Sequence, residues 1–149
     1  STQAKTLFPY TTLFRSTIEV SGYVSKVAEV SEVRAKLVEQ QQEMGKNKGI
    51  VMDGRDIGTV VLPDAELKIF MTASAATRAQ RRFDELVQKG DSVSYDEVLK
   101  NVEERDYIDT HREDSPLVMA EDAVEIDNSY LTREEQFQAV LELVNGIID

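Results

Sequence analysis

The sequence predicts an α/β fold in which a parallel sheet is covered by helices on both faces. Short apolar stretches alternate along the chain with segments whose apolar residues recur at helical spacing, and this alternation is typical of strand–helix–strand units. The 149 residues are 41% hydrophobic and 30% charged, which is the composition of one globular domain. We therefore expect a single domain with one core.

The first half of the chain predicts one helix and two strands. Apolar residues recur at near-helical spacing over residues 31–44, and glycines follow that segment and stop the pattern. Residues 50–52 and 67–71 are short apolar stretches, so we predict buried strands there. Between them lie a charged, glycine-rich turn at residues 53–58 and the apolar residues 60–62.

Capping patterns predict two helices in the middle of the chain. Ser74 stands where an N-cap would begin a helix that ends near Gly90. Ser94 and Glu97 then form the pattern of a capping box, which predicts a second helix running to about His111.

A third strand and a last helix complete the predicted fold. Residues 123–126 are apolar enough for a buried strand, and Thr132 with Glu135 repeats the capping-box pattern. The apolar residues that follow have the spacing of an amphipathic helix.

Composition excludes several classes of function. The absence of cysteine excludes disulfides and thiolate metal sites, and with 17 basic against 28 acidic residues the net charge is -11. A chain this acidic offers no broad basic surface to a nucleic acid polymer. No apolar stretch approaches the roughly 20 residues that a membrane helix needs. We expect a soluble, cytoplasmic protein, monomeric by default, whose partners are small molecules.

Residues 1–17 fit nothing that follows them. The stretch LFPYTTLFRS at residues 7–16 looks like a sequence found at the ends of unrelated translated chains. We interpret residues 1–17 as an unrelated or artefactual leader and residues 18–149 as part of one domain.

Asp53 is the first candidate site residue. It directly follows the predicted strand at residues 50–52, and ligands of parallel sheets bind beyond the carboxyl ends of the strands. A carboxylate there can orient a hydrated magnesium ion. The alternative is an Asp that only caps a turn.

Arg55 and Asp56 share a loop between Gly54 and Gly58. The glycines allow close approach of a ligand, so the Arg can bind a phosphate and the Asp can accept from a donor such as an exocyclic amine. The alternative is a local salt bridge within a tight turn.

Arg78, Arg81 and Arg82 fall at helical positions i, i+3 and i+4, on one face of the predicted helix. Their mutual repulsion favours an anion between them, and polyphosphate is the natural candidate. The alternative is a solvated face on which they pair with Asp84 and Glu85.

Arg105, Asp109 and Arg112 form a second stripe at i, i+4 and i+7. The Asp can accept from a ribose hydroxyl and the guanidiniums can bind phosphate, whereas the alternative is an exposed ladder of ion pairs. His111 has no Ser or Cys partner pattern nearby. The sequence contains no nucleophile elbow, no zinc-binding spacing and no dinucleotide GxGxxG.

In order and spacing, these residues resemble the bacterial cytidylate kinase family. The resemblance runs from about Tyr23 to the C-terminus and is strongest in DGRDIGTVVLPDAELKIF at residues 53–70. It continues through ERD at 104–106, SPL at 115–117 and AEDA at 120–123.

The resemblance implies a three-layer nucleoside monophosphate kinase fold with a P-loop, a parallel sheet and a helical lid, here at about residues 83–99. It also implies a role for each candidate residue. Ser25, Arg34 and Asp56 would contact the cytosine ring, Arg55 and Arg112 the monophosphate, Arg105 and Asp109 the sugar, and Arg78, Arg81 and Arg82 the donor triphosphate.

The implied reaction passes a phosphoryl group from ATP to CMP or dCMP, giving ADP and CDP or dCDP. It needs no protein nucleophile, because alignment and positive charge from arginines and Mg²⁺ provide the catalysis, while lid closure excludes water. The residues that we expect to serve it are Asp53, Arg55, Arg81, Arg82 and Arg112.

The sequence departs from the family because it has no GxxxxGK[ST] loop to cradle the donor phosphates and ligate magnesium. The segment that follows this loop and clamps the monophosphate in the family, and the first strand of the sheet, are also absent from the sequence. We therefore assign no metal ligand and interpret the chain as the C-terminal two-thirds of a cytidylate kinase. The alternative is a catalytically incompetent chain that at most binds cytidine nucleotides. A scaffolding protein is a third possibility, but it would have no need for the stripe that contains Asp109.

Overall fold

The computed structural model describes residues 18–148, and within α2 the side chains of only some residues are described. None of the helices in this part of the chain is both long and apolar enough to cross a membrane. The elements in chain order are α2 (Ile18–Ala28), α3 (Ser31–Gly45), the π-helical turn η1 (Ile57–Val61), β1 (Ile69–Thr72), α4 (Ala75–Gln88), α5 (Tyr95–His111), β2 (Val124–Asp127) and α6 (Arg133–Ile148).

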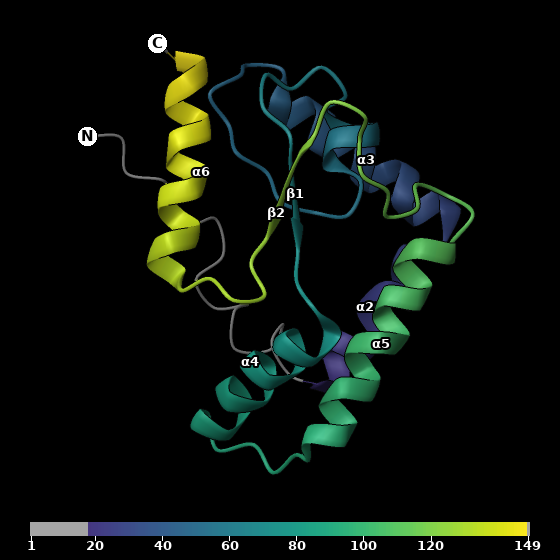
Figure 1. Cartoon of the computed structure of the whole chain (residues 1–149). Helices are drawn as coiled ribbons and strands as arrows, with labels where there is room; N and C mark the ends of the chain where they lie inside the picture. Colours follow the sequence, from purple (N-terminus) through teal and green to yellow (C-terminus); the bar gives the residue numbers. More distant parts are fainter. Residues whose placement is uncertain (1–17, 149) are drawn as a thin grey trace.

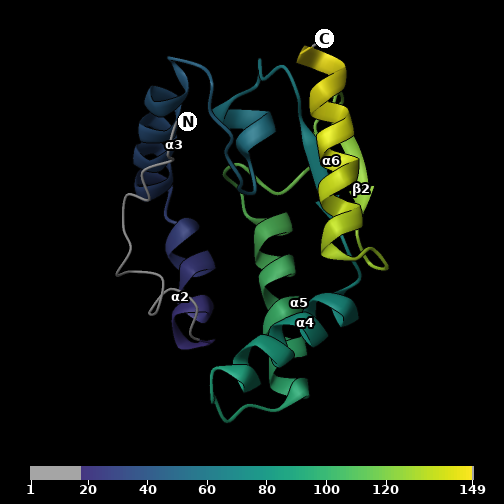
Figure 2. The same cartoon turned by 90° about the vertical axis from the view of Figure 1, so that its left-hand side faces the viewer.

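The described sheet consists of β1 and β2, which pair in parallel with Ile69 opposite Val124 and Thr72 opposite Asp127. These strands confirm the predictions at residues 67–71 and 123–126. Just before them, the Nζ of Lys68 donates to both carboxylate oxygens of Asp122 at 2.8 Å and so fixes the register of the two strands. Figures 1 and 2 show α6 on one side of this sheet and η1 with α3 on the other.

The strand predicted at residues 50–52 is wrong. This stretch has no regular structure, and Val51 is 99% exposed. A strand needs a neighbour to accept and donate its backbone hydrogen bonds, and among residues 18–148 only β1 and β2 pair. The sheet that we expected to be covered on both faces is also only partly buried here, since Met71 of β1 is 40% exposed.

Helix boundaries agree closely with the capping patterns. The hydroxyl of Ser74 accepts from the backbone N–H of Thr77 at the start of α4, and Ser94 with Glu97 makes a complete capping box on α5. Gly90 follows α4 with a φ of +89°, in the left-handed region that glycine adopts without strain. The predictions for α3, α4, α5 and α6 are therefore confirmed, whereas α2 was not predicted.

The best-packed apolar cluster lies between α4 and α5. Leu86 and Ala79 of α4 are fully buried against Val98 of α5, which is 2% exposed. The rings of Phe83 and Tyr95 meet edge to face, with centroids 6.3 Å apart. Figure 1 shows the two helices as a hairpin at one end of the molecule. Most of this cluster falls within residues 83–99, whose function as a lid stays a prediction.

We expect Leu86→Ala to lower the free energy of unfolding by about 2–5 kcal/mol, because the change leaves a cavity where no water can enter. Val87, the next residue, is 50% exposed and provides a matched control. Val87→Ala should change stability by less than about 0.5 kcal/mol. Urea denaturation of both variants measures the difference, and equal losses would contradict the packing described for α4 and α5.

The capping box of α5 predicts a pH dependence. The backbone N–H and the hydroxyl of Ser94 both donate to the carboxylate of Glu97 and lower its pKa below 4.5. A lowered carboxyl pKa in the folded state stabilises the protein above the unfolded-state pKa, and this stabilisation is lost as the pH falls through the folded-state pKa.

The difference in stability between the unaltered chain and Glu97→Gln should therefore be present at pH 7 and shrink as the pH falls below 4.5. Glu103→Gln removes the same charge from an exposed position of α5 and serves as the control. Thermal unfolding at several pH values measures both. The same pH dependence in the two variants would rule out a specific contribution from the cap.

Candidate functional site

Asp56 begins the site, and it is paired across the fold rather than within its own turn. Its side chain is 7% exposed and accepts from Arg34 of α3, with 2.7 Å between Oδ2 and Nη1. The Nε of Arg34 donates to the backbone carbonyl of Ala28 at 2.9 Å, so this guanidinium is fixed on two sides. The alternative of a local Arg55–Asp56 salt bridge is wrong, because each of these two residues pairs elsewhere.

The π-helical turn η1 begins directly after Asp56. The backbone carbonyl of Asp56 accepts from the N–H groups of both Val60 and Val61, at 2.9 and 3.1 Å. Val61 is buried and anchors the turn. Such wide turns are uncommon and frequently occur at functional sites. The glycine-rich loop therefore ends in a π-helical turn whose hydrogen bonds fix the backbone of Asp56.

Asp109 of α5 is the second buried carboxylate, and it joins two arginines. It is 4% exposed; its Oδ2 accepts from Nε of Arg55 at 2.8 Å, and its Oδ1 lies 3.5 Å from Nη1 of Arg112. An exposed ion-pair ladder would place all of these groups in solvent. The alternative of such a ladder is wrong, since the side chains of Asp109 and Arg112 are 5% and 2% exposed.

Arg112 lies at the C-terminal end of α5, and one nitrogen of its guanidinium, the buried Nη2, has no hydrogen-bond partner among the described residues. Its Nε donates to the carbonyl of Ser115 at 2.8 Å. Burial lowers the pKa of Arg112, and the positive charge of nearby Arg34 lowers it further, while Asp109 and Asp56 act in the opposite direction. The guanidinium stays charged at neutral pH, so this environment favours an added anion.

Arg105 belongs to the same cluster, one helical turn before Asp109. Burial lowers its pKa, and the charge of Arg55 adds to this effect. Four guanidiniums, those of Arg34, Arg55, Arg105 and Arg112, thus act on one another around two buried carboxylates. These six groups carry an excess of two positive charges, which matches the charge of a phosphate monoester near neutral pH.

The three arginines of α4 make separate contacts. Arg78 makes a bidentate pair with Asp106 of α5 at 2.8 and 2.6 Å, and this hydrogen-bonded carboxylate raises its pKa. Arg81 donates to the backbone carbonyl of Asn128 at 2.7 Å. Arg82 pairs with Glu85 at 2.8 Å, and its positive charge helps to lower the pKa of Arg105. The solvated-face alternative therefore fits Arg82, whereas Arg78 and Arg81 join α4 to other elements.

Two predicted site residues are not placed by these contacts. Asp53 is exposed in the loop before η1, and because the strand at 50–52 is absent, it does not stand at a strand end as we expected. Ser25 falls within α2, but its side chain lies outside the described ones. Among the described residues, no three acidic or histidine side chains lie close enough together to hold a metal ion.

Sequence reasoning missed two residues of the site. Asp106 holds Arg78, and the only signal for it was its place beside Arg105 in the ERD stretch. The carbonyl of Ser115 fixes Arg112, and no sequence pattern reports a backbone carbonyl. A hollow of about 300 Å³ lies elsewhere, between the end of α3 and the loop at residues 62–66, and none of the cluster arginines lines it.

Comparison with known proteins identifies the family. The family model described as cytidylate kinase matches residues 12–146. Proteins named cytidylate kinase from Flavobacterium johnsoniae, Flavobacterium psychrophilum and Phocaeicola vulgatus are 83%, 78% and 61% identical to this chain. The alignments cover 89%, 88% and 89% of the chain but 57%, 58% and 58% of the relatives, so it spans just over half their length. The chain belongs to the cytidylate kinase family.

Proposed function

We propose that this chain supplies the acceptor side of an enzyme that transfers a phosphoryl group from ATP to CMP or dCMP, giving ADP and CDP or dCDP. The observation that carries the proposal is the cluster of Arg34, Arg55, Arg105 and Arg112 around two buried carboxylates, with two positive charges in excess. The names of the relatives add support, since each is called a cytidylate kinase.

The Arg34–Asp56 pair has the chemistry needed to read cytosine. Cytosine presents one amine donor beside two acceptors, the ring nitrogen and the carbonyl. The carboxylate of Asp56 accepts from the amine, and the guanidinium of Arg34 donates to the acceptors. In the structure the two groups satisfy each other at 2.7 Å, so neither is left buried and unpaired. Ser25 is proposed as a third contact to the base.

The rest of the cluster is proposed to hold the sugar phosphate. Arg112 offers a buried Nη2, and Arg55 is 46% exposed at its side chain, so both have donors for phosphate oxygens. Asp109 accepts from a ribose hydroxyl, with Arg105 beside it. Holding the acceptor phosphate rigidly is the main contribution to a reaction that needs alignment more than covalent chemistry.

The donor side is proposed to involve Arg78, Arg81 and Arg82 with the helical hairpin at residues 83–99. Mg²⁺ commonly reaches proteins through one or two carboxylates and the substrate phosphates. Exposed Asp53 fits that use, through water. When bound, Mg²⁺ neutralises charge on the transferred phosphoryl group. We propose a cytoplasmic setting, where these nucleotides are found, and no nucleic acid partner.

The chain alone is proposed to bind cytidine nucleotides without measurable turnover. The observation behind this second candidate is the sequence itself, which contains no GxxxxGK[ST] loop. Loss of such an electrostatic cradle costs orders of magnitude in rate.

Calorimetric titration of the chain tests the acceptor site. CMP should bind more tightly than AMP, and Asp56→Ala should weaken CMP binding by at least about ten-fold, because a charge-assisted hydrogen bond to the amine is lost. Asp64→Ala is the control, since Asp64 is an exposed aspartate of the loop that follows η1.

Asp56→Asn keeps the shape of the side chain and guards against loss of folding in the alanine variant. An amide can donate to the carbonyl that replaces the amine in uracil, so this variant should bind CMP less tightly relative to UMP. Equal affinities of the unaltered chain for CMP and AMP would contradict the proposed specificity.

A chimera tests the reaction. In it, the 132 aligned residues of this chain replace their counterparts in the Flavobacterium johnsoniae cytidylate kinase, to which they are 83% identical. We expect the chimera to phosphorylate CMP much faster than AMP in a coupled ADP assay, and the isolated chain to be inactive at micromolar concentration. A chimera that binds CMP but transfers no phosphate to it would remove the proposed activity.

A further inference from the structure

We propose that Ser115 is a positioning residue for Arg112: its carbonyl, held in place by a left-handed backbone, aims the buried Nη2 of Arg112 at the phosphate of the bound nucleotide. This inference rests on the proposed function and adds a residue whose contribution comes from the backbone.

The backbone of Ser115 is strained. Its φ is +50°, in the left-handed region that L residues other than glycine seldom adopt, and the next residue is Pro116, which further disfavours helical conformations at Ser115. Among residues 18–148, Lys48 is the one other non-glycine residue whose φ is positive. Strain of this kind persists only where surrounding contacts hold it, and it gathers at functional sites.

Two hydrogen bonds hold the strained residue against the end of α5. The Nε of Arg112 donates to the carbonyl of Ser115 at 2.8 Å, and the backbone N–H of Leu117 donates to the carbonyl of Asp109 at 2.7 Å. The chain thus turns back immediately after α5 and returns to the residue that holds Arg55. A relaxed, extended Ser115 would point its carbonyl elsewhere and release Nε.

The contacts of Arg112 determine the direction of its remaining donor. The guanidinium is planar and rigid, so fixing Nε on Ser115 while Nη1 lies 3.5 Å from Asp109 also fixes Nη2. The side chain is 2% exposed, so bulk water does not satisfy Nη2. An oxygen of an anionic ligand provides the missing partner, and the excess positive charge around it selects phosphate.

The same loop is fastened to α3. The hydroxyl of Ser31 donates to the carboxylate of Asp114, beside Ser115 in the chain. Ser31 begins α3, one turn before Arg34, which we propose binds the base. The loop therefore contacts both α3 and α5, and its contact with α3 is made by Asp114 rather than by the carbonyl of Ser115.

The test compares CMP with cytidine, which lacks the phosphate, by calorimetric titration of the full chain. Ser115→Val places a β-branched residue where left-handed φ is least tolerated, and should weaken CMP binding by about ten-fold while changing cytidine binding less than two-fold. Ser115→Thr, a milder change, should lie between Val and the unaltered chain. In Ser115→Gly the glycine adopts the same φ without strain, so this variant should bind CMP as tightly as the unaltered chain does.

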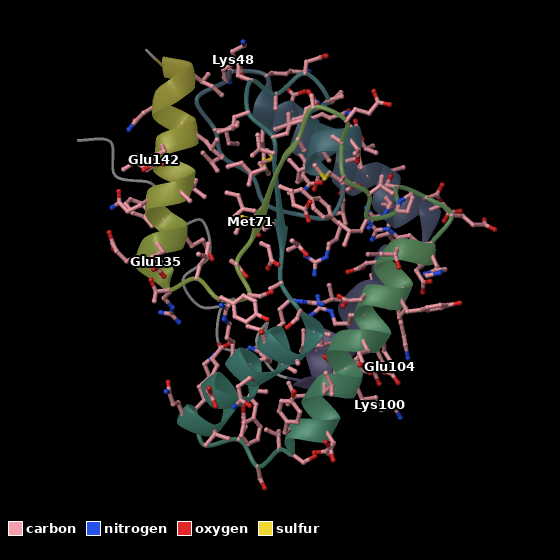
Figure 3. The ribbon with its side chains drawn as sticks, in the orientation of Figure 1. Lys48, Met71, Lys100, Glu104, Glu135 and Glu142 are labelled. Carbon is pink, nitrogen blue, oxygen red and sulfur yellow. The ribbon has the colours of Figure 1, made fainter. Side chains whose placement is uncertain are left out.

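Lys48→Val is the matched control, because Lys48 has a φ of +54° and pairs with Glu66 rather than with the arginine cluster. Figure 3 shows Lys48 at the end of the molecule away from Lys100 and Glu104 of α5. This variant should leave the ratio of CMP to cytidine affinity unchanged. Circular dichroism checks that every variant is folded.

The outcomes distinguish a failure of the proposed function from a failure of the role proposed for Ser115. Failure of the unaltered chain to bind either ligand would remove the proposed function, and this inference with it. Binding of cytidine as tightly as CMP would keep the base site but overturn the inference. An equal loss for both ligands in Ser115→Val, or no loss for CMP, would also overturn it, because the loop would then be merely structural.

Discussion

Two buried carboxylates, those of Asp56 and Asp109, each need cationic partners, and this need is the constraint on which the arrangement of the chain depends. Asp56 and Asp109 are 6% and 4% exposed, and removing a carboxylate from water costs several kcal/mol unless cations and hydrogen bonds replace the water. Their partners come from α3, from the loop before η1 and from α5. Satisfying two charges therefore brings together three segments that are distant in sequence.

Apolar packing has a different and more local role. The fully buried apolar residues of α4 and α5 pack on one another, and the ion pair between Arg78 of α4 and Asp106 of α5 also lies within this hairpin. Arg81 of α4 connects the hairpin to the loop after β2, where it donates to the backbone carbonyl of Asn128. The hairpin is thus held together internally by both apolar packing and an ion pair.

Sequence reasoning succeeded where the signal was local. Ser74, and Ser94 with Glu97, mark helix starts because the residues that satisfy the first free N–H groups lie within one turn. It failed at residues 50–52, since an apolar run becomes a strand only beside a partner strand, which no short pattern reports. It also missed η1, for whose wide backbone hydrogen bonds we found no sequence signal.

For the site as well, sequence patterns predicted what depends on nearby residues and missed what depends on residues far away in the chain. Helical spacing correctly placed Arg105, Asp109 and Arg112 on one face, but it could not distinguish a buried cluster from an exposed ladder, because burial depends on what packs against that face. The partner of Asp56 lies 22 residues away, in α3. The family resemblance named Arg34, yet the direct pairing of Arg34 with Asp56 comes only from the three-dimensional arrangement.

In the proposed acceptor site, the pairing of Arg34 with Asp56 also has a consequence for discrimination between bases. Arg34 and Asp56 already satisfy each other at 2.7 Å, so a base gains affinity only if it replaces both halves of that pair. Cytosine offers a donor to Asp56 and acceptors to Arg34, whereas a base with a carbonyl in place of the amine would leave a buried carboxylate facing an oxygen. Leaving a buried charge unpaired costs more than a hydrogen bond contributes, so in the proposed site the wrong base is rejected more strongly than the right one is attracted.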